Sequence, residues 1–358
     1  MRKVLASSLI SVIALSQGSA MAEVTNADQK MVLIKTIGGT ISPKSVLASD
    51  SGLISAHNMM YSHSVTIYDA NKAELIATVP DSVVLSDFGF TKYSGSYKGA
   101  PVEGAYSPDG KYLYFTNYAM YGKGFNKEGH DTCSPASGYD SSFLSRINLE
   151  SKKIDAVYPV GSVPKVVKVT PNNKYLLVSN WCSYTVTVIS IETGKTVKSI
   201  KIGRYPRGIA ITNDSKYAYV AEMGGSNIHR IDLSDFSKTM IPVGSNPRAI
   251  VLSPDESKLY VTMNFSGKVQ AWDLITNKTI KSVKTGQAAR SLDISSDGSA
   301  LFVVNFESDT VSKVRASDMK VLQTIKVCNE PIGVTYDSST NRTWVACYGG
   351  ALKVFSNN

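Results

Sequence analysis

The chain has 358 residues, of which 43% are apolar and 19% charged, with 26 Gly, 13 Pro and 4 Cys. This composition is typical of a globular protein and excludes collagen-like, coiled-coil and disordered chains. The formal charge is +9, yet no long run of Lys or Arg marks a polyanion-binding segment. Tyrosine is unusually frequent, with 19 residues against 3 Trp and 10 Phe.

The first 22 residues have the pattern of a secretory signal peptide. Arg2 and Lys3 precede an apolar run over 4–15, and small residues then lead to a cleavage site after Ala22. The apolar run is too short to span a membrane. Cleavage would remove two basic and no acidic residues, which lowers the charge from +9 to +7. We therefore expect a periplasmic or secreted protein without a membrane span.

One pattern recurs along the rest of the chain. It consists of a Gly, two residues, a Pro, an alternating apolar run, a tight turn and a Tyr/Val-rich run that ends in Asn. Seven copies are marked by their Pro-like positions, which are Pro43, Pro101, Pro164, Pro206, Pro247, Ala289 and Pro331. From Pro164 onward these positions recur every 41 or 42 residues, whereas the two earlier intervals are 58 and 63 residues.

Each copy predicts four short strands, as in the fourth copy at 206–212, 217–223, 227–233 and 238–243. Four strands in about 40–45 residues are typical of a propeller blade. We therefore predict an all-β fold, a single seven-bladed β-propeller over 23–358. The last copy lacks a fourth strand, and Met31–Ile37 matches the fourth strand of another copy, Lys320–Val327. The N-terminal strand is thus expected to complete the last blade and leave no open edge at the join.

One strand motif recurs as Tyr260–Asn264, Leu113–Asn117 and Leu177–Asn180, and one turn motif as Ser253–Asp255 and Ser107–Gly110. By these motifs the copies resemble the YVTN-type β-propeller repeat family, which includes YncE-like exported proteins. The resemblance covers residues 31–355. It implies a scaffold used for binding, with nucleic-acid binding among the tasks of relatives, so the function has to be argued from the site.

The predicted topology places all four cysteines on one face. We call this the top face; it carries the loop before the first strand of each blade and the loop after the second strand. Cys328 and Cys347 lie on neighbouring antiparallel strands, whereas Cys133 and Cys182 lie in top loops of neighbouring blades. Four cysteines allow three pairings, and this placement favours Cys328–Cys347 and Cys133–Cys182. Free thiols or thiolate metal ligands are the alternative, which an oxidising compartment disfavours.

Two extra segments of the second blade also fall on the top face. The first insertion covers about 81–99 and the second about 119–142. Long loops on a rigid scaffold usually carry function. We therefore expect Tyr121, Phe125 and Tyr139 to contact a ligand. The alternative is a decorative loop fixed by Cys133–Cys182.

Two sets of side chains repeat around the top face. The residue after the Pro-like position is basic in five blades, which defines the basic ring: Lys44, Lys165, Arg207, Arg248 and Arg290. The residue after the Asn-like position forms the aromatic set: Tyr118, Trp181, Phe265, Phe306 and Tyr348, with Met59 and Met223 in the remaining blades. Guanidinium forks and aromatic faces suit an anionic small molecule, a glycan, a peptide or protein, or single-stranded nucleic acid. Alternatively, both sets are structural and pair with neighbouring blades.

A metal-assisted enzyme is the competing hypothesis. His57, Met59, His63 and His130 carry imidazole and thioether groups that suit copper or another divalent ion, although no zinc signature is present. Glu103 and Glu222 would then act with a top-loop His in lactonase- or lyase-like acid–base chemistry. No nucleophile elbow, zincin motif or phosphate loop occurs. We therefore favour a monomeric, non-catalytic binding scaffold without a cofactor.

Overall fold

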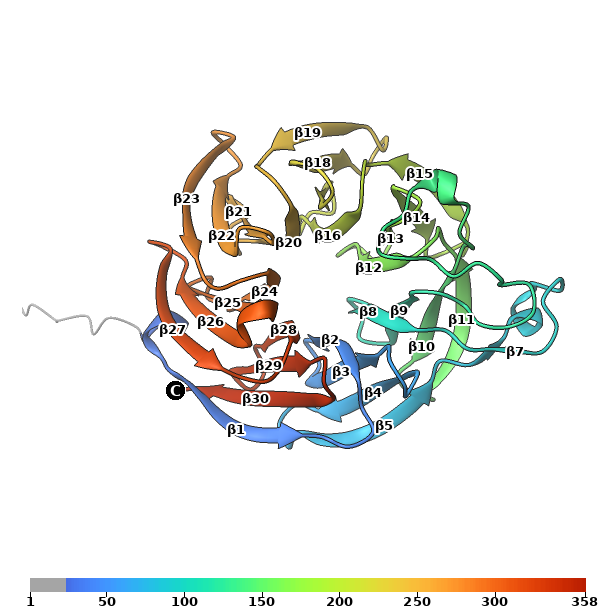
Figure 1. The fold of residues 1–358 in the computed structure, drawn as a ribbon, viewed down its shortest axis with the longest axis horizontal. Coiled ribbons are helices and arrows are strands. Elements are labelled where there is room, and N and C mark those ends of the chain that lie inside the picture. Colours follow the sequence, from blue (N-terminus) through green and yellow to red (C-terminus); the bar gives the residue numbers. More distant parts are fainter. Residues whose placement is uncertain (1–23) are drawn as a thin grey trace, which may run out of the picture.

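The computed structural model describes residues 24–358, so the predicted signal peptide lies outside the described residues. Within that range, seven four-stranded antiparallel sheets surround a central axis as the blades of a propeller (Figure 1). This confirms the predicted seven-bladed β-propeller. None of the helices between residues 24 and 358 has the length and apolar character needed to cross a bilayer.

The strands follow the chain from the inside of each blade to its outside. Blades one and two contain β2 (Pro43–Ala48), β3 (Leu53–Asn58), β4 (Ser64–Asp69), β5 (Glu74–Pro80), β8 (Pro101–Tyr106), β9 (Tyr112–Asn117), β10 (Phe143–Asn148) and β11 (Lys153–Pro159). Blades three and four contain β12 (Pro164–Val169), β13 (Tyr175–Asn180), β14 (Thr185–Ser190), β15 (Thr196–Lys201), β16 (Pro206–Ile211), β17 (Tyr217–Glu222), β18 (Asn227–Asp232) and β19 (Lys238–Pro242). Blades five and six contain β20 (Pro247–Leu252), β21 (Lys258–Met263), β22 (Lys268–Asp273), β23 (Lys278–Lys284), β24 (Ala289–Ile294), β25 (Ala300–Asn305), β26 (Thr310–Arg315) and β27 (Lys320–Lys326). Blade seven contains β28 (Pro331–Asp337), β29 (Arg342–Cys347), β30 (Ala351–Asn357) and β1 (Met31–Ile37).

Blade seven is built from both ends of the described chain. Strand β1 pairs antiparallel with β30, with Met31 opposite Asn357 and Ile37 opposite Leu352. The outer edge of β30 is therefore covered, and the ring closes as predicted (Figure 1).

The first strand of every blade carries a bulge directly after its first residue. In blade four, for example, the register shifts between Pro206 and Ile209. A bulge leaves its extra residue outside the hydrogen-bond ladder and re-aims the side chain. In the five blades of the basic ring, the basic residue after the Pro-like position lies within such a bulge, and the first strands line the central channel. The local backbone thus explains why the repeat places cations at the axis.

The apolar core is distributed over the seams between blades. Between blades three and four, for instance, Val186 and Val188 pack in one buried cluster with Ile209 and Val220. Each fully buried aliphatic side chain contributes about 1.5–3 kcal/mol relative to exposure. Rigid seams hold the first strands at fixed positions around the axis.

Both insertions are folded against the top of blade two. The first contains β6 (Val83–Val84), η2 (Leu85–Phe88) and β7 (Ser96–Tyr97), and the second contains η3 (Pro135–Ser137); the remaining 3-10 turns are η1 (Asn26–Asp28) and η4 (Phe306–Ser308). The Cys133–Cys182 disulfide ties the second insertion to blade three, and Cys328–Cys347 joins the loop before β28 to the end of β29. The predicted pairing is thus confirmed.

Candidate functional site

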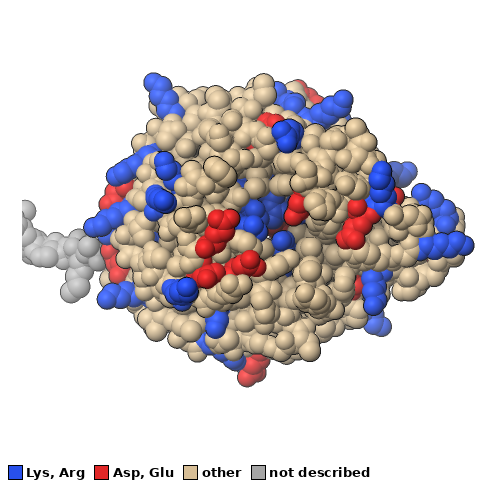
Figure 2. All heavy atoms as spheres, in the orientation of Figure 1, with Lys and Arg blue, Asp and Glu red and all other residues tan. Residues whose placement is uncertain are grey.

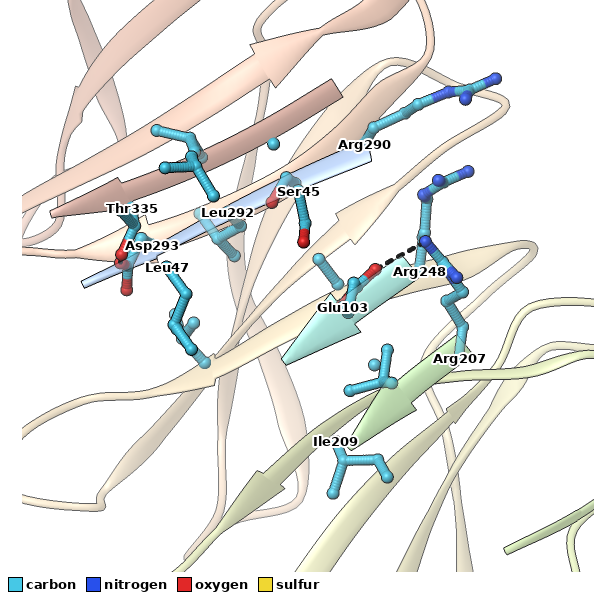
Figure 3. A pocket seen from close by; sticks show the side chains of 18 of the residues that line it. Ser45, Leu47, Glu103, Arg207, Ile209, Arg248, Arg290, Leu292, Asp293 and Thr335 are labelled. Carbon is cyan, nitrogen blue, oxygen red and sulfur yellow. Dashed lines mark hydrogen bonds and ion pairs between the residues drawn. The ribbon is translucent and has the colours of Figure 1, made fainter. Parts of the chain in front are cut away.

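A cavity of about 130 Å³ lies on the propeller axis between the first strands. Arg207, Arg248 and Arg290 gather at one end of it, whereas Asp293 and Thr335 lie at the other (Figure 3). Figure 2 shows the corresponding hollow in the surface, with basic side chains on its floor and acidic side chains beside its mouth. The basic ring therefore surrounds an enclosed space instead of forming an exposed patch.

The basic ring is largely removed from water. Lys165, Arg207 and Arg248 are each less than a tenth exposed. In the part of the chain that the structure describes, two of the five cations pair with a carboxylate. Nη2 of Arg207 lies 2.7 Å from Oε1 of Glu103, and Nζ of Lys165 lies 3.4 Å from Oδ1 of Asp131. Within residues 24–358, the five basic groups thus have two carboxylates in direct contact, which leaves an excess of basic side chains.

Burial and mutual repulsion disfavour the charged forms of these groups. Burial, reinforced by the other four ring cations, holds the pKa of Lys44 well below its ordinary value. The same causes, burial first, lower the pKa of Lys165 to about 7 and that of Arg290 to about 10. Burial and the neighbouring guanidinium groups also bring the pKa of Arg248 well below its ordinary value. A bound anion would reverse these shifts by supplying the missing negative charge.

Two guanidinium nitrogens at the cavity lack hydrogen-bond partners. Nη1 of Arg207 and Nε of Arg290 are buried and donate to no acceptor among residues 24–358. A buried donor without an acceptor costs about 1–3 kcal/mol. The cavity can therefore provide unsatisfied donors, together with positive charge, to a ligand that brings acceptor oxygens.

Much of the aromatic set packs against the basic ring itself. Nζ of Lys165 lies 4.3 Å from the ring centre of Tyr118 and 5.4 Å from that of Trp181. The guanidinium of Arg290 lies 3.4 Å from the ring centre of Phe306, and Lys44 lies 4.9 Å from that of Tyr348. Cation–π contacts of this kind stabilise the cations without neutralising them. They also occupy aromatic faces that a sugar or base would need for stacking.

Phe265 does not belong to the aromatic set, which corrects the sequence alignment. In blade five Pro247 pairs with Met263, whereas Pro206 of blade four pairs with Glu222. Met263 therefore occupies the Asn-like position, and the residue after it is Asn264. Phe265 lies one position further along, in the loop, and is 91% exposed. The Tyr-Val-Thr-Met-Asn match had placed the repeat one residue too late.

The aromatic residues of the insertions are divided between packing and the surface. Phe125 stacks on Tyr93 with ring centres 4.8 Å apart and belongs to a small core that includes Tyr97 and Phe143. Tyr97 and the other buried members of this core hold the two insertions together. Phe125 is therefore better explained as a packing residue than as a ligand contact.

Tyr121 and Tyr139 are bound to their own insertion. The Tyr121 hydroxyl donates to Glu128 over 2.7 Å, and its ring meets the edge of His63. Nζ of Lys127 lies 5.8 Å from the ring centre of Tyr139. Tyr121, Phe125 and Tyr139, which were expected to contact a ligand, thus do not form one common surface in the structure.

Asp131, which the sequence analysis did not single out, brings a carboxylate to the mouth. Its backbone carbonyl accepts a 2.9 Å hydrogen bond from Nε1 of Trp181, and its side chain reaches Lys165. Burial opposes ionisation, but the charges of Lys165, Lys44 and Arg207 outweigh it and lower the pKa of Asp131. The insertion has no counterpart in other blades, so repeat alignment gave no signal for this residue.

Glu307 and Glu330 add negative charge in the neighbourhood of Arg290. Both favour the charged form of Arg290 through space. Figure 2 shows red side chains next to the blue floor of the hollow. A ligand therefore passes an acidic rim before it meets the basic ring.

The residues of the metal hypothesis are each engaged elsewhere. His57 lies in β3, not in a loop; it is fully buried with Nδ1 2.8 Å from Oγ of Ser45, and burial lowers its pKa to about 3. His63 Nδ1 lies 2.6 Å from the Gly99 carbonyl oxygen, and His130 accepts from the backbone N–H of Thr132. Met59 packs against the apolar cluster around Trp181. Among residues 24–358, no three His, Cys, Asp or Glu side chains form a group able to hold a metal ion.

The two candidate catalytic carboxylates have separate partners. Glu103 binds Arg207, as described above. Glu222 contacts Nε2 of His229 at 3.1 Å and accepts hydrogen bonds from Asn227 and from the backbone N–H of Arg204. Burial lowers the pKa of His229, although Glu222 opposes this shift. Through these contacts Glu222 connects the strands and the entry loop of its own blade.

No family model matches the chain. Over 153 residues, 40% of this chain, it is 31% identical to Antigen Lp49 of Leptospira interrogans, and the matched region is 33% of that protein. The chain thus spans about a third of the length of this curated relative. The structure of hydrazine synthase from Kuenenia stuttgartiensis has a TM-score of 0.68 at 17% identity, covering 89% of this chain and 96% of that chain. The protein is therefore similar in sequence to part of a leptospiral antigen, and in fold to a propeller chain of known structure.

Proposed function

We propose that this protein is an exported binding propeller that holds a small anion in the cavity enclosed by the basic ring. One observation carries the proposal: four cations line the cavity and a fifth, Lys165, lies beside it, and among residues 24–358 two of the five have a carboxylate partner. Such a surplus of buried positive charge is unfavourable in the free protein. An anion removes this cost on binding, so the site favours negative ligands strongly.

The geometry favours a small ligand over a polymer. The cations lie on the floor of a hollow and enclose about 130 Å³, which suits a group of the size of sulfate, phosphate or a short carboxylate. A nucleic-acid strand would need exposed cations and free aromatic faces. Here Tyr118, Phe306 and Tyr348 already face ring cations. The two disulfides of the described chain fit a periplasmic or extracellular location.

Thermal unfolding with added anions tests the proposal. Sulfate, phosphate and a dicarboxylate are compared with chloride at equal ionic strength, and calorimetry then gives the dissociation constant. We expect the divalent anions to raise the melting temperature, and Arg248→Gln and Arg290→Gln each to weaken binding by about tenfold or more. Lys216→Gln removes one charge from a bottom turn and serves as the matched control. Equal responses to sulfate in the wild type and both ring variants would exclude the ring as the site.

A further inference from the structure

Lys165 is placed differently from the other four members of the basic ring. Lys44, Arg207, Arg248 and Arg290 line the cavity, whereas the amine of Lys165 sits beside it, under the second insertion. Its side chain is 7% exposed and lies between the rings of Tyr118 and Trp181. The outer side of the amine is closed by Asp131.

Burial and the neighbouring cations favour the neutral form of this amine, whereas Asp131 and the two aromatic rings favour its charged form. Burial acts first, and the charges of Arg207 and Arg248 add to it, while Asp131 opposes them; together they bring the pKa of Lys165 to about 7. The remaining neighbours are Lys44, which adds positive charge, and the phenol of Tyr118, whose own pKa is raised by burial. A neutral lysine amine near neutral pH is a nucleophile, as in enzymes that form Schiff bases.

Three kinds of group meet here: a buried amine, a carboxylate 3.4 Å away, and guanidinium groups with free donors. We propose that Lys165 forms an imine with a small carbonyl-bearing anion of the α-keto or α-aldehydo acid class, whose carboxylate is held by the basic ring. This inference rests on the proposed anion binding and adds a covalent step to it.

The step balances without an oxidant or reductant. The lone pair of Nζ attacks the carbonyl carbon, a C–N bond forms, and the carbonyl oxygen takes the electron pair and a proton. The carbinolamine then loses that oxygen as water, and the C=N bond replaces the C–O bond. Asp131 accepts the proton that leaves the nitrogen and returns it to the departing hydroxyl, a role that suits a carboxylate next to the amine.

Asp131 is the exposed contact of this otherwise buried amine. The side chain of Asp131 is 78% exposed, so it can turn into solvent without leaving a packed site. The backbone of Asp131 meanwhile stays fixed by the hydrogen bond from Trp181. A carbonyl compound can therefore reach Nζ from the mouth while the insertion remains in place.

Reductive trapping tests the inference. The full chain is incubated at pH 7 with glyoxylate and cyanoborohydride, and peptide mass spectrometry locates carboxymethyl-lysine. We expect Lys165 to be modified at least about tenfold faster than the exposed Lys216 and Lys326, because burial and the neighbouring cations lower the pKa of the Lys165 amine. The rate should rise with pH, and its midpoint should lie above pH 7 because the bound carboxylate opposes the lowering of the pKa of Lys165. Lys165→Arg should lose this modification, and Asp131→Asn should slow it.

A parallel measurement separates this inference from the proposed function. Sulfate stabilisation is recorded on the same protein, and propanal replaces glyoxylate as an uncharged carbonyl. If sulfate stabilises the protein but Lys165 reacts no faster than exposed lysines, the imine inference is wrong and anion binding stands. If propanal modifies Lys165 as fast as glyoxylate, the assignment of a carbonyl-bearing anion is wrong. If sulfate has no effect, the proposed function itself fails.

Discussion

The carboxylate of Glu103 in blade two accepts a 2.7 Å hydrogen bond from Nη2 of Arg207 in blade four, so this ion pair passes over blade three at the channel mouth (Figure 3). It neutralises one ring cation, while Nη1 of the same guanidinium has no acceptor among residues 24–358. The pair therefore sets how much positive charge the cavity offers to a ligand.

Glu103→Gln should tighten sulfate binding and weaken the fold. The neutral amide leaves Arg207 without a counter-charge, which costs about 1–3 kcal/mol in the free protein. A bound divalent anion recovers much of this loss. Calorimetry with sulfate and urea unfolding at low ionic strength provide the two measurements. Glu74→Gln, on an outer strand, changes the charge by the same amount and serves as the control. An unchanged sulfate affinity of Glu103→Gln would contradict the expectation.

Arg248→Met should stabilise the protein when no divalent anion is present. Arg248 is buried, and no carboxylate pairs with it among the described residues. Replacing such a charge by an apolar side chain of similar length removes repulsion within the ring, and we expect a gain of about 1–3 kcal/mol in the free energy of unfolding. Sulfate should then add little further stability. A loss of stability in sulfate-free buffer would show that another group satisfies this guanidinium.

Removing the Cys133–Cys182 disulfide should change both stability and affinity. The bond closes a separation of 49 residues, and its loss costs about 2–4 kcal/mol. The insertion would also hold Asp131 less firmly over the mouth, so sulfate should bind more tightly to Cys133→Ser/Cys182→Ser. Cys328→Ser/Cys347→Ser removes the other disulfide, with a separation of 19 residues, and should lower stability alone. Equal sulfate affinities of the two double variants would contradict the role given to the insertion.

Asp81 should make stability fall as pH rises from about 4 to about 7. Burial raises the pKa of Asp81 to about 7, against an ordinary value of 3.8, although nearby His63 opposes the shift. Between these values the folded protein binds a proton that the unfolded chain has released, so the free energy of unfolding decreases with pH. Urea unfolding from pH 4 to pH 8 measures this slope. Asp81→Asn should flatten it, whereas Asp109→Asn, in a bottom turn, should not.

The fold could be predicted from the sequence because every copy of the repeat carries the same local features. A Pro-like residue, a bulge and a turn recur in each blade, and the first strand begins at the expected residue from Pro43 to Pro331. The closure by Met31–Ile37 followed from the missing strand in the last copy. The pair Cys328–Cys347 followed from the adjacency of two strands, and Cys133–Cys182 from top loops of neighbouring blades.

The candidate site could be predicted only in part from the sequence, because it depends on distances between blades on opposite sides of the channel or not adjacent to each other. The basic ring could be read from the repeat, but the Glu103–Arg207 pair connects blades that are not neighbours, which no local pattern encodes. Asp131 reaches Lys165 from an insertion without a counterpart in other blades. Phe265 was misplaced because Met263 replaces the expected Asn, and only strand pairing reveals the register.

The pairing of β1 with β30 also determines when the charges meet during folding. Joining Met31 to Asn357 closes the longest loop that the described chain contains, a slow event in topologies with many distant contacts. Blade six precedes blade seven in the chain, whereas blade one lies beside blade seven only when the ring closes. Lys44 and Arg290 therefore approach each other late in folding, and their repulsion opposes the closure of the propeller ring. An anion present at that moment would act as a folding template as well as a ligand.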